Sequence, residues 1–75
     1  MSALLKESRN ETDIKPGQRL CSIKQAAVIL GRSPWTVAEM VRSGRLPYIP
    51  DGKRRFLDIH DLNDWIEKSK RRDLD

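Results

Sequence analysis

Polar and apolar positions alternate with a helical period in the segment that begins near residue 22. Ser22 and Gln25 have the spacing of a capping box, in which each side chain bonds the other residue's backbone N–H. Gly31 is a typical left-handed helix end. The sequence therefore predicts a helix from about residue 22 to residue 30, with one apolar face made of Ile23, Ala26, Ala27 and Leu30.

A second, shorter helix follows after a turn of about three residues. Ser33 is a suitable N-cap, and Pro34 suits the first helical position because that position needs no backbone N–H. Gly44 ends the helix, and the Leu46-Pro47 step requires extended chain. Two helices joined in this way are typical of a helix-turn-helix. The expected buried face consists of Val37, Met40 and Val41.

The opposite face of this second helix carries Trp35, Glu39 and Arg42. An arginine can bond guanine through two donors, and a glutamate can accept from cytosine. A tryptophan offers an apolar surface to a sugar or a thymine methyl group. The pattern predicts a helix that inserts into a DNA groove, although Trp35 could instead fold back as an extension of the core.

Two short strands are predicted next, at residues 48–50 and 55–57, on either side of an Asp51-Gly52 turn. Pro50 cannot donate a backbone hydrogen bond, so the first strand should lie at a sheet edge. A hairpin with a basic tip after a helix-turn-helix is typical of a wing that contacts phosphate or the minor groove. The basic residues near its tip are Lys53, Arg54 and Arg55.

The last predicted helix begins at the N-cap Asp58. Its apolar stripe contains Ile59, Leu62, Trp65 and Ile66, which assigns Trp65 to the core. The predicted fold is mainly α with a small β-hairpin: a winged helix-turn-helix of three helices and a two-stranded wing. We expect a flexible N-terminal arm at 1–18, the DNA-binding domain at 19–67 and a basic, polar C-terminal tail at 68–75.

The charge distribution indicates a polyanion as the partner. The chain of 75 residues has a net charge of +4, and the excess falls in residues 42–55. That window has five basic residues against Asp51, while residues 56–75 are net acidic. A local basic patch on a nearly neutral remainder favours nucleic acid over a merely solvated surface. The basic residues of the window are Arg42, Arg45, Lys53, Arg54 and Arg55.

Composition argues against several other classes of protein. A chain this short leaves little room for an enzyme with a buried cleft. No apolar run approaches the roughly 18 residues of a membrane span, and the first residues do not have the pattern of a secretory signal. Cys21 and His60 are each the sole residue of their type, which supports neither a metal site nor a catalytic site. We expect no enzyme activity, no cofactor and a cytoplasmic, nucleoid-associated protein.

The ordered set of motifs in SIKQAAVILGRSPWTVAEMVRSGRLP and DGKRRFLDIHDLNDWI resembles the small winged helix-turn-helix domains of phage and transposon excisionases. That family is related to the DNA-binding domain of MerR-type regulators, and the resemblance covers about residues 20–67. It implies a recognition helix that carries Ser33, Trp35, Thr36, Glu39 and Arg42, and a wing that carries the three basic residues after Gly52. A full MerR-type sensor is not expected, because the chain continues only briefly after its third helix.

Two positions depart from the family pattern. The family often has an aromatic residue where this chain has Ala38 and a basic residue where it has Glu39. Because a carboxylate repels phosphate, phosphate contacts are expected to fall to other residues.

Three functions remain open from the sequence. The first is an excisionase, a sequence-specific accessory factor that binds and bends double-stranded DNA to assist an integrase. The second is a small transcriptional regulator of a mobile element with the same fold. The third is a protein-interaction module that uses the basic patch. We expect a monomer in solution that assembles cooperatively on DNA.

Overall fold

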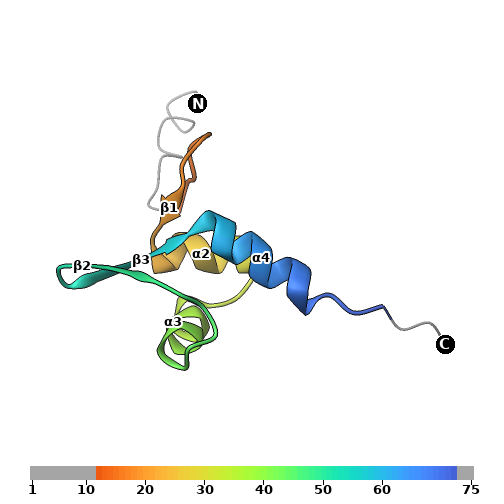
Figure 1. Ribbon diagram of the computed structural model, residues 1–75. Coiled ribbons are helices and arrows are strands. Elements are labelled where there is room, and N and C mark those ends of the chain that lie inside the picture. Colours follow the sequence, from red (N-terminus) through yellow and green to blue (C-terminus); the bar gives the residue numbers. More distant parts are fainter. Residues whose placement is uncertain (1–11, 73–75) are drawn as a thin grey trace.

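The computed structural model describes residues 12–72, and Figure 1 shows how their helices and strands are arranged. Three helices pack with one small antiparallel sheet, which confirms the predicted winged helix-turn-helix class. In chain order the elements are β1 (Leu20–Cys21), α2 (Ile23–Leu30), α3 (Pro34–Arg42), β2 (Ile49–Asp51), β3 (Arg54–Asp58) and α4 (Ile59–Ser69). The β2–β3 hairpin extends from one side of the helices, and the chain after α4 leaves from the other side.

Helix boundaries are set by the capping residues that the sequence indicates. The Ser22 hydroxyl accepts from the Gln25 N–H at 3.1 Å, and the Gln25 Oε1 accepts from the Ser22 N–H at 3.0 Å, so the capping box is complete. Gly31 ends α2 in the left-handed conformation with φ of +68°. Asp58 caps α4 by accepting from the His60 N–H at 2.9 Å.

The sheet has three strands in the order β1-β3-β2, one more than the predicted wing. β1 pairs antiparallel with β3, and Cys21 lies opposite Leu57. β2 is the strand at the other edge, as Pro50 requires. This three-stranded arrangement ties the hairpin to the start of α2, because β1 immediately precedes that helix.

The hairpin turn lies one residue later than predicted. Asp51 pairs with Arg54, so the two turn residues are Gly52 and Lys53, and the predicted Asp51-Gly52 turn is wrong by one position. Gly52 has φ of +64°, while Lys53 keeps a negative φ. A glycine in the first of two loop positions is the pattern of a type II′ turn, which matches the twist of the flanking strands. Lys53 therefore occupies the tip itself.

The core lies between the two helices of the helix-turn-helix, β3 and α4. Leu62 of α4 is fully buried, whereas Trp65 is only half-buried and packs against the rim of the core. Burial raises the pKa of the Cys21 thiol, because the thiolate would lose its hydration. Cys21 is thus an apolar packing residue. The buried set is Cys21, Ala26, Ala27, Val37, Met40, Val41, Leu46, Leu57 and Leu62.

Polar contacts attach the chain before β1 to the domain. The Arg19 guanidinium pairs with the Asp58 carboxylate at 3.0 Å, and the Arg19 carbonyl accepts from the Ile59 N–H at 2.8 Å. The Gln25 amide donates to the Asp13 carbonyl at 2.7 Å. Most of the arm predicted at 1–18 lies outside the described residues, as do residues 73–75 of the tail. α4 continues to Ser69, so the predicted boundary at 67 falls within its last turn.

Within residues 12–72 there is no helix with the length and apolar character needed to cross a membrane.

Candidate nucleic-acid interface

Helix α3 is held in place by its N-cap and by one apolar face. The Ser33 hydroxyl accepts from the Thr36 N–H at 3.1 Å and lies 2.9 Å from the Thr36 hydroxyl. Val37, Met40 and Val41 are buried, as predicted. The caps and the buried face together fix which side of α3 points to solvent. Ser33 and Thr36, both expected in the site, lie at the N-terminal end of this helix.

The solvent side of α3 carries the three residues that the sequence assigns to base recognition. Trp35 is 72% exposed, so it does not fold back onto the core. Arg42 and Glu39 form an ion pair through two contacts; the arginine Nε lies 3.2 Å from Oε2, and Nη2 bonds Oε1. This hydrogen bond is the main cause of the raised pKa of Arg42. The sequence suggested two independent groups, whereas the structure joins them into one unit.

The hairpin presents Lys53, Arg54 and Arg55 to solvent. Within residues 12–72, none of these three cations forms an ion pair with a carboxylate, in contrast to Arg19, Arg42 and Lys70. Their charge is therefore available to an external anion. The Arg55 guanidinium lies over the Tyr48 ring at 5.4 Å from its centroid, a cation–π contact that leaves the charge exposed.

A groove runs between the hairpin and the first turn of α2. Its walls include Lys24 on one side and the three hairpin cations on the other, and no carboxylate of residues 12–72 lines it. Lys24 carries no signal in the sequence that would mark it as part of this surface, because nothing local relates it to a hairpin about thirty residues away. Tyr48, which the Arg55 guanidinium covers, is likewise not among the predicted site residues. The pairing of the two strands could have suggested the contact between Tyr48 and Arg55. Ile49 lies opposite Phe56, so Tyr48 and Arg55, the residues just before these two, are diagonal neighbours across the hairpin.

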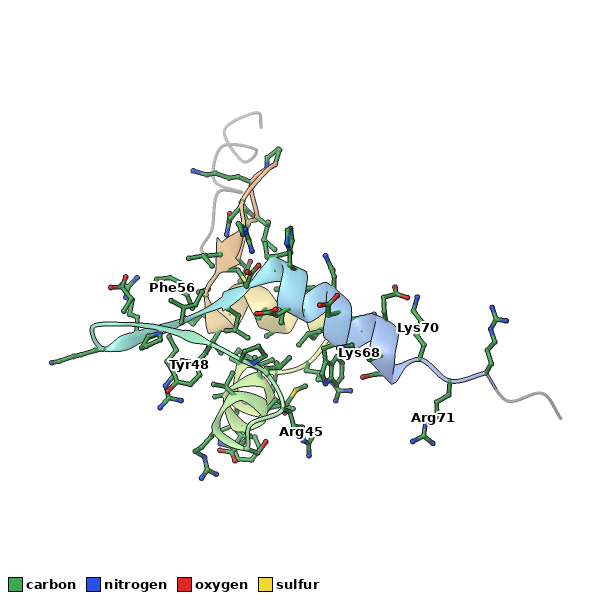
Figure 2. All side chains as sticks on the ribbon, in the orientation of Figure 1. Arg45, Tyr48, Phe56, Lys68, Lys70 and Arg71 are labelled. Atoms are coloured by element: carbon green, nitrogen blue, oxygen red, sulfur yellow. The ribbon has the colours of Figure 1, made fainter. Side chains whose placement is uncertain are left out.

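Arg45 lies apart from the hairpin cations. Figure 2 shows it at the C-terminal end of α3, on the side opposite Tyr48. It lines a second groove together with Asp61, Asp64 and Lys68, so its surroundings are of mixed charge. The structure thus brings the three hairpin cations together and places Arg45 at a separate position beyond α3.

In the part of the chain that the structure describes, Cys21 and His60 lie apart from each other in environments of different kinds. His60 is exposed in the first turn of α4, and Cys21 is buried in the core. Across residues 12–72, no three His, Cys, Asp or Glu side chains gather as they would around a metal ion. The prominent surface features are the exposed side of α3 and the hairpin.

The two-helix unit, its exposed second helix and the attached basic hairpin are the features of a helix-turn-helix DNA-binding domain. Residues 20–70 match the family model described as "Helix-turn-helix domain", so the chain belongs to that family. It is a DNA-binding family that includes excisionase-like proteins. The chain shows no significant match to a curated protein or to a solved structure.

Proposed function

We propose that the protein binds specific sites on double-stranded DNA, with α3 in the major groove and the β2–β3 hairpin on the adjacent backbone. The observation that carries the proposal is the contrast in charge pairing. Lys53, Arg54 and Arg55 of the hairpin have no carboxylate partner among residues 12–72, whereas Arg42 on α3 is paired. Unpaired cations suit phosphate, and an exposed helix with polar and aromatic side chains suits base edges.

The proposed contacts divide into two kinds. On α3, Trp35 and Arg42 face the bases, with Glu39 paired to Arg42 on the same side of the helix. Ser33 and Thr36 lie where the helix N-terminus would approach a phosphate. On the hairpin, the three cations contact backbone phosphates or the minor groove, and Lys24 extends that cationic surface to α2. Arg45 contacts the backbone on the far side of α3. Phosphate contacts would supply affinity, and α3 would supply sequence preference.

We further propose that this DNA binding serves site-specific recombination, as an excisionase. Membership of a family that includes excisionase-like proteins supports this role. The resemblance of the ordered motifs to those of excisionase domains points the same way. Contact with two neighbouring grooves favours a deformed duplex, and a bent recombination arm would help an integrase to assemble. A domain this small buries a limited DNA surface, so adjacent copies or integrase contact would add to its affinity.

A titration with labelled duplex DNA at several salt concentrations tests the binding proposal. We expect saturable binding that weakens steeply as salt rises. Absence of duplex binding, together with binding to an acidic protein, would instead support a protein-interaction module.

A gel-mobility assay tests the excisionase role. It uses fragments in which the bound site is placed at different distances from the ends. Mobility that depends on the position of the site would indicate a bend and support the excisionase. Position-independent mobility would count against the excisionase role, whereas a bend alone does not separate an excisionase from a transcriptional regulator of the same fold, because regulators also bend DNA.

A further inference from the structure

The Glu39–Arg42 pair determines which edge of the arginine is available. Glu39 and Arg42 are three residues apart on α3, so their side chains lie on neighbouring turns of one face. The glutamate occupies the Nε/Nη2 edge of the guanidinium through both of its oxygens. The Glu39 side chain is 35% exposed and that of Arg42 is 69% exposed, so the arginine is the more exposed partner of the pair.

A guanidinium has five N–H donors in one plane. The pair with Glu39 uses one donor on Nε and one on Nη2. Nη1 keeps both of its hydrogens, and Nη2 keeps one. The Nη1/Nη2 edge of Arg42 therefore still has two parallel N–H groups, and it points away from the carboxylate that holds the plane.

We propose that Glu39 is a positioning residue that holds Arg42 for end-on recognition of a guanine. Among base edges in the major groove, guanine alone presents two neighbouring acceptors, O6 and N7, which match two parallel donors. Adenine offers one acceptor beside a donor, and thymine offers one acceptor beside a methyl group. The inference rests on the proposed insertion of α3 into the major groove, and it names the base that this helix selects.

The same geometry assigns Glu39 no base of its own. Its two oxygens already accept from Arg42, and a cytosine amino group would have to compete with that charged donor. The carboxylate also lowers the net charge of α3. Glu39 therefore contributes selectivity through Arg42 while it weakens attraction to phosphate in general.

The test begins with selection of a binding site from a random duplex library by the unaltered protein. Affinities are then measured for duplexes that carry each of the four base pairs at every position of the selected site. We expect one guanine whose replacement lowers affinity by about 5- to 150-fold, the range of a good two-donor contact. Arg42→Lys, which keeps the charge but loses the paired donors, should abolish that preference.

Glu39→Ala should reduce the same guanine preference and raise affinity for unrelated duplexes. The double variant Glu39→Ala/Arg42→Lys should discriminate no worse than Arg42→Lys alone, because both changes act on one contact. Glu67→Ala is the matched control, since Glu67 in the last turn of α4 forms an equally spaced pair, at 3.0 Å, with Lys70, the residue that follows the helix. It removes the same charge and should leave the guanine preference unchanged.

Two results would overturn this inference alone. In the first, the protein selects a site, yet Glu39→Ala retains the full guanine preference. In the second, Glu39→Ala removes a preference for cytosine that Arg42→Lys does not affect, which would mean that Glu39 reads a base directly. If the unaltered protein selects no sequence from the library, the proposed function fails and the inference fails with it.

Discussion

The hairpin cations offer the most quantitative test of how this domain binds DNA. Lys53 occupies the turn and Arg54 begins β3, and neither side chain packs into the core or pairs with a carboxylate in residues 12–72. Replacing both by alanine should therefore leave the fold intact. Arg55 stays on Tyr48, and the hairpin keeps Gly52, on which its turn depends.

The expected change follows from counterion release. Each phosphate contact contributes about −0.9 to the slope of log affinity against log salt, so two lost contacts make the slope shallower by about 1.8. Between 50 and 200 mM salt, a fourfold change, each contact weakens binding by about 3.5-fold. The affinity advantage of the unaltered protein over the double variant should thus shrink by about 12-fold across this range.

Fluorescence anisotropy with a labelled duplex would measure both slopes. The matched control replaces Lys70 and Arg71 by alanine. Figure 2 shows these two residues at the end of the molecule opposite the hairpin. That variant loses the same charge and should keep nearly the full slope. Equal losses of slope in both variants would refute a specific hairpin contact. A preserved slope with a lost sequence preference would mean that the hairpin reads bases.

The remaining predictions concern stability. Leu62→Ala should lower the free energy of unfolding by about 2–5 kcal/mol, because it leaves a buried cavity. Trp65→Ala should lower it by less than the usual aromatic truncation, because Trp65 lies at the rim of the core. Urea denaturation of both variants checks this, and equal large losses would place Trp65 in the core. Hydrogen bonds from Arg19 and from the His60 N–H lower the pKa of Asp58 in the folded protein. The ionised carboxylate therefore contributes fully to the free energy of unfolding above the unfolded pKa of about 3.9, and this contribution is lost as the pH falls through the folded pKa. Between pH 7 and pH 2, the free energy of unfolding should fall less for Asp58→Asn than for the unaltered protein. An equal fall in both would contradict this linkage.

The sequence predicted the parts of the fold that short-range chemistry determines. Each helix start depends on residues within three positions of one another, as in the Ser22–Gln25 box and the Ser33 cap that precedes Pro34. The buried faces follow directly from helical periodicity. Helical periodicity did not predict whether Trp35 is exposed, because an indole that points to solvent and one that folds back onto the core both fit the pattern.

Contacts between distant residues could not be predicted in the same way. β1 has only two residues, too few to show an alternating pattern, and it exists because β3 lies beside it. Arg19 and Asp58 are 39 positions apart. The Glu39–Arg42 pair does have a helical spacing, so it could have been anticipated, but the spacing alone does not say which guanidinium edge remains available.

The central claim is that α3 and the hairpin form the DNA-contacting surface, and the two tryptophans provide a direct test. The protein has one tryptophan on the solvent side of α3 and one on α4, so its NMR spectrum should contain two indole N–H signals. Titration with the selected duplex should shift the Trp35 signal and the hairpin amides while the Trp65 signal changes little. A shifted Trp65 signal with an unperturbed Trp35 signal would contradict the account.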